Sequence, residues 1–268
     1  GLDIPALCFE ENDKLNITEY TQICMLAVEA AIYQAIIDKG ITPDVTAGLS
    51  LGEYGALIAS GAMTMADAFA VVRKRGIYMQ EAVPTGGAMT AVLGLDPQVI
   101  EDICKKTADE TNSVVSVANY NCPGQIVITG EKVAVDAAAA ACSEAGAKRC
   151  VPLKVSGPFH SAMLKGAGEK LADALESVEI HDIKVPYITN VTADYVKSPA
   201  DVKDYLTQQV SSSVRWQQTI ERLIADGADE FVEIGPGRSL SGFMRKINRD
   251  VKVVNIDKLE DFEKYVNR

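Results

Sequence analysis

A Gly-Leu-Ser-Leu-Gly motif at residues 48–52 constrains the fold of this chain more than any other feature. An apolar segment precedes the motif, and a helical pattern follows over residues 51–60. The two glycines let the backbone pass closely on either side of a sharp strand-to-helix turn, so that Ser50 projects at its tip. The free N–H groups of the helix, which starts at Leu51, point to where negative charge would develop on an oxygen beside Ser50. A glycine-rich turn without chemistry is the alternative, but the flanking strand and helix favour a catalytic serine.

The chain contains only two histidines, His160 and His181, so a catalytic serine has two possible imidazole bases. His160 lies in a Gly-Pro-Phe-His-Ser loop directly before a helical pattern, and loops on a rigid scaffold commonly place catalytic groups. His181 lies in a polar connection and is predicted to be exposed. His160 is therefore the candidate general base for Ser50. A pair of Cys122 with a histidine is the competing arrangement, which ranks lower because small buried cysteines are common.

Composition limits the class of protein. With 268 residues, of which 47% are hydrophobic and 24% charged, the chain is long enough for one large domain or a domain with an insert. No uninterrupted apolar run of membrane-spanning length and no signal-peptide pattern is expected. The net charge of -11 argues against nucleic acid as a partner. The six cysteines form no Cys-x-x-Cys motif, which predicts reduced thiols in a cytoplasmic protein and no zinc site.

The order of the predicted elements indicates an α/β fold in two parts. Residues 1–86 and 155–268 alternate helices with apolar strands, which predicts an α/β-hydrolase-like core with a parallel sheet covered on both faces. Residues 87–154 follow the order β-α-β-β-α-β and are predicted to form an inserted, ferredoxin-like small subdomain. The helical patterns span residues 21–39, 51–60, 64–82, 96–108, 133–145, 162–177, 200–210 and 213–226, with a further helix after residue 237. The strand patterns span 88–93, 113–118, 126–129, 148–154, 186–191, 231–234 and 251–256.

Several short blocks stand along the chain in a fixed order. Besides the motif at residues 48–52, they are Arg-Gly-Ile-Tyr-Met-Gln at 75–80, Asn-Cys-Pro-Gly-Gln at 121–125, Gly-Pro-Phe-His-Ser at 157–161, Val-Arg-Trp at 214–216 and Glu-Ile-Gly-Pro-Gly at 233–237. Together they resemble the malonyl-CoA:acyl carrier protein transacylases of fatty acid synthesis, and the acyltransferase domains of polyketide synthases are similar. The resemblance covers nearly the whole chain from about Leu15 onward.

The resemblance implies roles for four residues in the chemistry. Ser50 would accept the malonyl group as an ester, and His160 would deprotonate first Ser50 and then the incoming thiol. The backbone carbonyl of Gln209 would orient the imidazole, in place of a carboxylate that no spacing in the sequence selects. The backbone N–H of Leu51 would supply an oxyanion donor.

The resemblance also implies substrate-binding residues. Arg75 would clamp the free carboxylate of malonyl, although by pattern alone it belongs to a solvated helix face with two other basic residues. A planar guanidinium can hold a carboxylate through two parallel hydrogen bonds, which lysine cannot reproduce. Phe159 resembles the residue of a malonyl-type pocket, and Asn119 and Asn121 are the remaining candidates for contact with the substrate.

The activity implied by the resemblance is a ping-pong transfer of malonyl from malonyl-CoA to the phosphopantetheine thiol of an acyl carrier protein. No metal or redox cofactor is expected, and neither nucleic acid nor a membrane is an expected partner. The protein is expected to be a monomer. Carrier proteins are acidic in this family, so docking would need a local basic patch on this acidic chain. Its candidate residues are Lys148, Arg149, Lys154, Lys165, Arg245 and Lys246.

Two departures from the family pattern keep alternatives open. The family usually opens with a strand and a Gly-Gln-Gly-x-x-Gln loop, which this sequence lacks, and Leu49 stands where the family generally has a histidine. We expect the sequence to be a shortened form of a complete enzyme, with a central sheet that lacks one strand. A serine esterase or thioesterase is the first alternative, and a degenerate, non-catalytic family member is the second.

Overall fold

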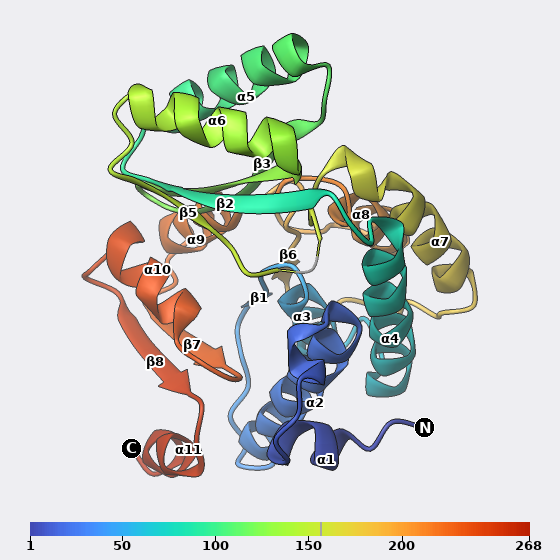
Figure 1. Cartoon of the computed structure of the whole chain (residues 1–268). Helices are drawn as coiled ribbons and strands as arrows, with labels where there is room; N and C mark the ends of the chain where they lie inside the picture. Colours follow the sequence, from blue (N-terminus) through green and yellow to red (C-terminus); the bar gives the residue numbers. More distant parts are fainter. Residues whose placement is uncertain (156) are drawn as a thin grey trace.

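The computed structural model describes residues 1–155 and 157–268. Figure 1 shows a four-stranded sheet with two helices above it, standing over a group of helices and short parallel strands. The helices are α1 (Ile4–Phe9), α2 (Thr18–Ile37), α3 (Gly52–Ser60), α4 (Met65–Ala82), α5 (Pro97–Thr111), α6 (Lys132–Glu144), α7 (Lys165–Glu176), α8 (Val202–Gln209), α9 (Trp216–Ala225), α10 (Ser239–Ile247) and α11 (Leu259–Val266). The strands are β1 (Thr46–Ala47), β2 (Gly87–Leu93), β3 (Val115–Cys122), β4 (Gln125–Glu131), β5 (Arg149–Pro152), β6 (Tyr187–Ile188), β7 (Glu230–Ile234) and β8 (Lys252–Ile256).

The four-stranded sheet is antiparallel, with strand order β3-β4-β2-β5. The chain runs through it as β-α-β-β-α-β, as predicted for this segment, and this strand order is that of a ferredoxin-like unit. One face packs against α5 and α6 through a core that includes Ile100, Ile128 and Ala138. On the other face Met89 and Val127 belong to a small apolar cluster against which Phe159 packs. The sheet therefore turns its second face toward the rest of the molecule, where the predicted site residues lie.

The remaining strands form two parallel pairs, and the predicted α/β class is confirmed. In one pair Thr46 of β1 is in register with Tyr187 of β6, and in the other Glu230 of β7 is in register with Lys252 of β8. Among the described residues, no backbone pairing joins β1–β6 to β7–β8, so the parallel strands do not form one continuous sheet.

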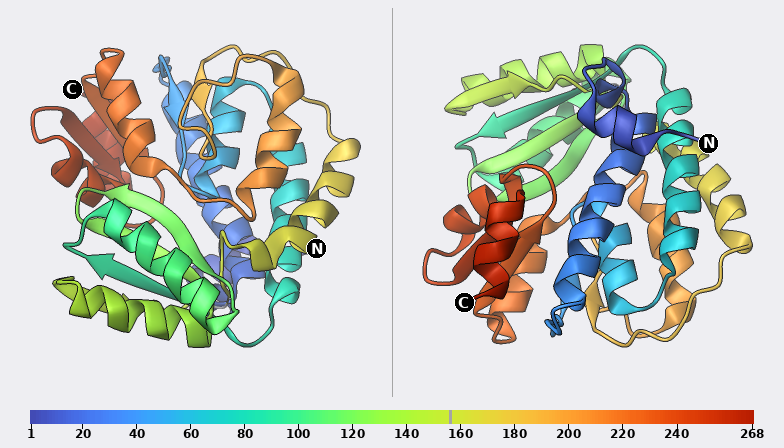
Figure 2. Two further views of the ribbon diagram at one scale, coloured as in Figure 1. Left: turned by 90° about the horizontal axis from the view of Figure 1, so that it is seen from above. Right: turned by 90° about the horizontal axis from the view of Figure 1, so that it is seen from below.

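Helix α2 is the long helix at the centre of the lower part of Figure 1, and it packs against α3 and α4. Figure 2 shows α2 (blue) running beside α4 (teal). The close approach depends on Gly76, because a Cβ there would lie 2.9 Å from the Cα of Glu19. By length and composition α2 could also cross a membrane, which corrects the prediction that no segment reaches that length. One face of the helix, with Ile23, Cys24 and Leu26, is buried in the main core.

Two helices were missed by the sequence analysis, and both are short. Helix α1 has six residues and is capped by Asp3, whose side chain accepts a hydrogen bond from Ala6 N–H. Helix α11 has eight residues and buries Tyr265 against Ile36 and Ile256. Segments of this length give few repeats of the helical period, so their pattern is weak until packing partners are known.

Candidate active site

Ser50 sits at the predicted strand-to-helix turn between β1 and α3. Its backbone is left-handed, with φ of 53°. Gly48 is required for this turn, because a Cβ there would lie 1.9 Å from the carbonyl oxygen of Gly52. Leu51 caps α3, and its N–H has no hydrogen-bond partner among the described residues. The local sequence therefore exposes the Ser50 side chain beside a free backbone donor, as an elbow requires.

His160 comes within hydrogen-bond distance of this serine. The distance from Ser50 Oγ to His160 Nε2 is 2.8 Å, and that from His160 Nδ1 to the Gln209 carbonyl oxygen is also 2.8 Å. The carbonyl can only accept, so Nδ1 carries the proton and Nε2 is free to accept from the Ser50 hydroxyl. His181 is more exposed and faces Glu179. The structure thus places Ser50, His160 and the Gln209 carbonyl in the order that the resemblance implied.

The imidazole of His160 lies in a dry and electropositive environment. Burial, followed by the positive charge of Arg75, lowers its pKa from 6.5 to about 4. Backbone hydrogen bonds from the ring to Gln209 and Ser212 oppose this shift. Burial disfavours the charged imidazolium because it loses its hydration. At neutral pH the ring is therefore neutral and able to accept a proton.

Arg75 does not lie on a solvated face, so the interpretation from pattern alone is wrong. The residue is 1% exposed, because α4 turns it toward the core while Lys74 next to it faces solvent. Its Nη2 donates to Ser50 Oγ at 3.2 Å and to Gln209 Oε1 at 2.9 Å, and its Nη1 donates to Gln22 Oε1 at 2.5 Å. Burial lowers the pKa of the guanidinium, which still remains protonated in proteins. A buried cation beside the nucleophile can bind an anionic group of a substrate.

Glu53 and Gln209 form the floor beneath Ser50. Gln209 Nε2 donates to Glu53 Oε2 at 2.6 Å and to the Ser50 carbonyl oxygen at 3.0 Å. Glu53 is fully buried, and burial raises the pKa of its carboxyl, opposed by hydrogen bonds from Asn190, Thr189 and Gln209 and by the charge of Arg75. The side chain of Gln209 thus links the carboxyl of Glu53 to the guanidinium of Arg75.

Sequence reasoning gave no role to Gln22, Glu53 or Asn190. Gln22 is a polar residue in an otherwise apolar stretch of α2, and Glu53 directly follows the serine motif, so both carried a signal that could have been used. Asn190 fell within the predicted strand 186–191, where an asparagine facing a core would have stood out. The structure brings all three within the hydrogen-bond network around Ser50.

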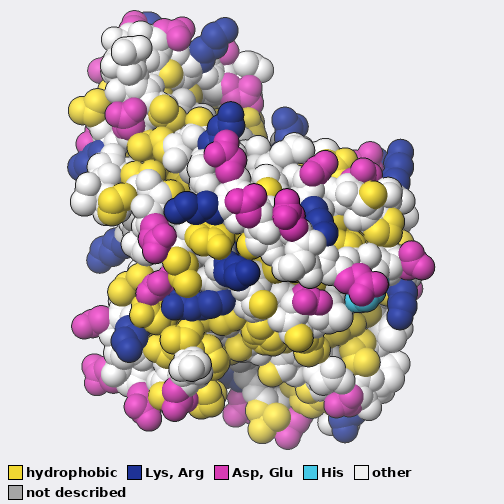
Figure 3. Space-filling model, turned by 90° about the vertical axis from the view of Figure 1, so that its right-hand side faces the viewer, with side chains coloured by type: hydrophobic (Ala, Val, Ile, Leu, Met, Phe, Trp, Pro, Cys, Tyr) yellow, Lys and Arg dark blue, Asp and Glu magenta, His cyan; other side chains and the backbone are white. Residues whose placement is uncertain are grey.

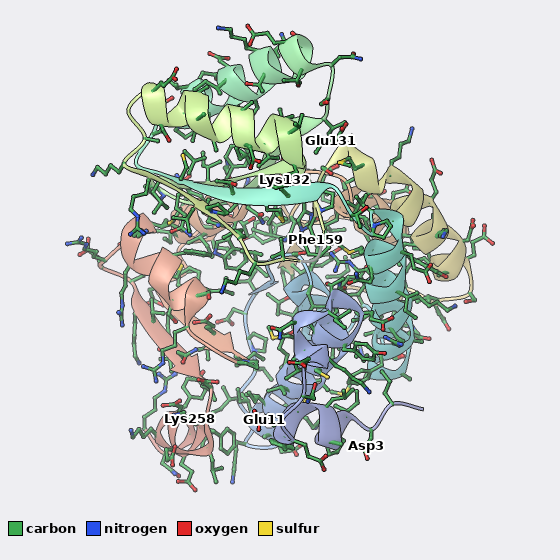
Figure 4. The ribbon with its side chains drawn as sticks, viewed as in Figure 1. Asp3, Glu11, Glu131, Lys132, Phe159 and Lys258 are labelled. Atoms are coloured by element: carbon green, nitrogen blue, oxygen red, sulfur yellow. The ribbon has the colours of Figure 1, made fainter. Side chains whose placement is uncertain are left out.

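The other predicted substrate residues lie between the two parts of the molecule. Phe159 packs against the lower face of the four-stranded sheet, and Figure 4 shows it below β2. Asn119 and Asn121 are 8% and 6% exposed on β3, where Asn119 also pairs with Val214. Burial raises the pKa of the Cys122 thiol, which disfavours a thiolate nucleophile there. The hydroxyl beside His160 is that of Ser50, so the Cys–His alternative has no geometric support.

The site offers no obvious place for a metal ion. Across residues 1–155 and 157–268, no group of three His, Cys, Asp or Glu side chains is arranged to hold one. Leu49, where the resembling family generally has histidine, packs in an apolar cluster with Val214 and Trp216. Among the described residues, the side chains that contact Ser50 Oγ by hydrogen bonds are those of His160 and Arg75.

Known proteins are similar in sequence to this chain over most of their length. A family profile described as "Acyl transferase domain" matches residues 4–256. A relative from Bacillus subtilis (strain 168), named malonyl CoA-acyl carrier protein transacylase, is 46% identical over 262 residues, covering 97% of this chain and 82% of the relative. A relative of the same name from Staphylococcus aureus (strain COL) is 43% identical over 94% of this chain and 81% of its own length.

Solved structures of malonyl transacylases also match this chain. The crystal structure of MCAT from Streptococcus pneumoniae matches with a TM-score of 0.95 and 46% identity over 100% of this chain and 87% of that chain. A second structure, of a type II PKS acyl-carrier protein in complex with its malonyl-transacylase, matches with a TM-score of 0.96 and 39% identity, with the same coverage. On the strength of these matches in sequence and in structure, the chain belongs to the acyl transferase family, among the malonyl CoA-acyl carrier protein transacylases.

Proposed function

We propose that this protein transfers a malonyl group from malonyl-CoA to the phosphopantetheine thiol of an acyl carrier protein, through a malonyl ester on Ser50. The observation that supports this most directly is the position of Arg75, whose Nη2 lies 3.2 Å from the Ser50 Oγ. A guanidinium this close to the nucleophile suits an acyl group that ends in a carboxylate. An uncharged acyl group would leave the buried cation without a bound anion to balance its charge, which is costly.

The transfer proceeds in two half-reactions at one serine. Ser50 Oγ attacks the thioester carbonyl as its proton passes to His160 Nε2, and the oxyanion that forms is stabilised by the N–H of Leu51. The C–S bond then breaks, and the CoA thiol leaves with the proton from His160. The thiol of the carrier arm reverses these steps: it gives its proton to His160, attacks the Ser50 ester and releases the Ser50 hydroxyl. Arg75 holds the malonyl carboxylate throughout.

A basic patch near the tip of the four-stranded sheet is our candidate for docking the acidic carrier. Lys246 Nζ donates to Gln125 Oε1 at 3.1 Å, and Gly94 N–H bonds to the Gly124 carbonyl at 2.9 Å. The side chain of Lys148 packs over Gly94, so both lysines lie at the end of the sheet where β2 finishes at Leu93 and β4 begins at Gln125. Arg149 directly follows Lys148, and Arg245 precedes Lys246. By contrast, the face shown in Figure 3 mixes acidic and basic side chains.

The proposal also covers the domain organisation, the cellular location and the oligomeric state. Residues 1–86 with 155–268 would act as the core, and residues 87–154 as a small subdomain that covers the site. We also propose that the protein works as a cytoplasmic monomer. All six cysteines are free, which suits a reducing compartment.

Intact-mass spectrometry after mixing with malonyl-CoA tests the proposal. The native chain should gain one malonyl group and lose it when a phosphopantetheine-bearing carrier protein is added, whereas Ser50→Ala should gain none. Malonylation without transfer to the carrier, followed by release of free malonate, would instead support the esterase alternative. Absence of any adduct on the native chain would contradict the proposed activity.

A further inference from the structure

The side chain of Asn190 bridges the two sides of the serine turn. Its Oδ1 accepts a hydrogen bond from the Ser50 N–H at 2.5 Å, and its Nδ2 donates to the Gly48 carbonyl oxygen at 2.6 Å. Asn190 is 140 residues away from Ser50 in the sequence and comes just after β6, which pairs with β1. One carboxamide thus closes a small ring across the turn that carries the nucleophile.

The backbone of Asn190 is also fully engaged. Its N–H donates to Glu53 Oε2 at 3.1 Å, and its carbonyl accepts from the N–H of Arg215 at 3.1 Å. The residue is 0% exposed, so these partners replace water completely. A buried amide with every polar group paired is held rigidly, because each alternative position would leave a donor or an acceptor unsatisfied.

The serine needs such support because its backbone is in an unfavourable region. At φ of 53° a residue with a side chain is strained, and such a conformation persists only where its surroundings over-determine it. The carboxamide of Asn190 matches this conformation specifically, since it joins an N–H and a carbonyl two residues apart in the turn. A carboxylate in the same place would lack the donor to Gly48 when ionised.

We propose that Asn190 is a positioning residue for the reaction: it holds Ser50 in the left-handed conformation that directs its Oγ toward His160. It also occupies the N–H of Ser50, so that of the two consecutive backbone donors Ser50 and Leu51, the one on Leu51 is left for the oxyanion. Glu53 supports the arrangement from below through the backbone of Asn190. This inference rests on the proposed function only for the identity of the acyl donor.

The test uses two reagents that react with the same serine. An uncharged fluorophosphonate phosphonylates an activated serine, with fluoride as the leaving group and the hydroxyl proton passing to the imidazole, and it does not require recognition of malonyl. In parallel, single-turnover malonylation is followed by intact mass. If the native chain reacts with the fluorophosphonate but not with malonyl-CoA, the proposed function fails while the role of Asn190 can still be measured.

Asn190→Ala should lower the maximal rate constant of phosphonylation by about a hundredfold, since a misplacement of about 1 Å in a reactive group has an effect of that order. The concentration of reagent that gives half of this rate should stay the same, because the binding surface is unchanged. Rates are compared per folded molecule, with near-ultraviolet circular dichroism as the measure of folding. A folded Asn190→Ala protein that reacts as fast as the native chain would overturn the proposal.

Asn190→Asp is a conservative substitution in which protonation should restore the rate of phosphonylation. It tests the proposal even if Asn190→Ala does not fold. A protonated Asp can accept from Ser50 and donate to Gly48, as the amide does, whereas the ionised form cannot. The charged or titratable groups around it are Glu53, His160 and Arg75. The nearby Glu53 favours the protonated form, and the native His160 ring stays neutral at pH 5.

The phosphonylation rate of Asn190→Asp should therefore be low at pH 8. The ratio of this rate to that of the native chain should rise at least about tenfold from pH 8 to pH 5. A rate equal to that of the native chain at pH 8 would overturn the proposal. Asn255→Ala is the matched control, because its carboxamide likewise donates to a glycine carbonyl, that of Gly237, and also to Glu233, but does so away from the serine turn. Its phosphonylation rate should equal that of the native chain even where its melting temperature falls.

Discussion

Two regions of the site are joined by a hydrogen bond between Arg75 and Ser50. One is the reacting pair, Ser50 and His160, and the other is Arg75 with the side chains beside and beneath it, here called the floor. The chain holds these two regions by different means. In the pair both residues have positive φ, 53° and 60°, and the contacts that hold them involve backbone groups: the Gln209 carbonyl orients the imidazole, and the Asn190 side chain binds the N–H of Ser50. Arg75 is held by side chains, through the carboxamide oxygens of Gln22 and Gln209. The comparison indicates that substitutions in the floor can change substrate preference while the reacting pair stays in place.

Gln209 is where the two regions meet, and it serves each with a different part. Its backbone carbonyl accepts from His160 Nδ1, while its side-chain oxygen accepts from Arg75. A substitution at Gln209 would keep the first contact and remove the second. The two regions are therefore separable in principle, and the predictions below test whether they separate in practice.

The largest effect is expected at the reacting pair. His160→Ala removes the base that takes the Ser50 proton, so the rate of Ser50 malonylation should fall by about 10³- to 10⁴-fold, the upper part of the range for general-base catalysis. Quenched-flow mixing with malonyl-CoA followed by intact-mass spectrometry measures this rate. His181→Ala is the control and should react like the native chain, because His181 is partly exposed and faces Glu179. An unchanged burst in His160→Ala would place the base elsewhere.

A smaller but selective loss is expected in the floor. Arg75→Ala should reduce malonyl transfer by roughly 10²- to 10³-fold, the loss of a charge-assisted, bidentate contact in a dry site, while transfer of acetyl from acetyl-CoA changes much less. The measured quantity is the ratio of kcat/KM for the two donors. Arg73→Ala on the same helix is the control, since Arg73 binds the carbonyl and carboxylate of Glu19 near the surface. Equal losses for both donors would show that Arg75 is not the carboxylate clamp.

The pH dependence of acylation should reveal the effect of Arg75 on the pKa of His160, which connects the two regions. Catalysis needs the neutral imidazole, so the rate falls as pH drops through the pKa of His160, which burial and Arg75 lower to about 4. Malonylation at pH 5 should therefore stay within about twofold of its value at pH 7, whereas an ordinary histidine with a pKa of about 6.5 would lose roughly 25-fold. Single-turnover rates across this range give the midpoint. A midpoint near 6.5 would contradict the dry site.

Removing the guanidinium sharpens this test. Without the positive charge of Arg75 the imidazolium is less disfavoured, so the midpoint in Arg75→Ala should move upward from that of the native chain. Acetyl-CoA is the donor for this profile, because malonyl binding is weakened in the variant. An unmoved midpoint would mean that burial alone sets the pKa of the base.

The sequence predicted the parts of the molecule whose determinants are local. Gly48, Ser50 and Gly52 lie within one short motif, so the turn could be inferred without knowledge of distant residues. Helix α4 was predicted almost to the residue because Thr64 supplies an N-cap, and its hydroxyl accepts from the N–H of Asp67. The antiparallel unit was predicted because its alternating strands and helices follow one another directly along the chain.

The parts that the sequence did not predict depend on contacts between distant residues. Gln22 is 53 residues from Arg75, and Asn190 is 140 residues from Ser50. Pattern placed Arg75 on a solvated face because it follows Arg73 and Lys74, and only the packing of α4 on α2 shows that it points inward. A buried charge cannot be recognised from periodicity until its partners are known, since burial without partners would be prohibitively costly.

The smallest effect is expected at Gln22, which touches only the side of Arg75 that faces away from Ser50. Gln22→Ala should raise the KM for malonyl-CoA about three- to tenfold, equivalent to roughly 1 kcal/mol of one hydrogen bond, while the kcat/KM for acetyl-CoA stays the same. Gln34→Ala is the matched control on the same helix, because its carboxamide binds the exposed Asp38. A malonyl-to-acetyl ratio that is the same in Gln22→Ala and the native chain would show that Gln209 alone aligns the guanidinium. A fall in both activities together would show instead that the floor and the reacting pair are one rigid unit, and the separation between them would have to be abandoned.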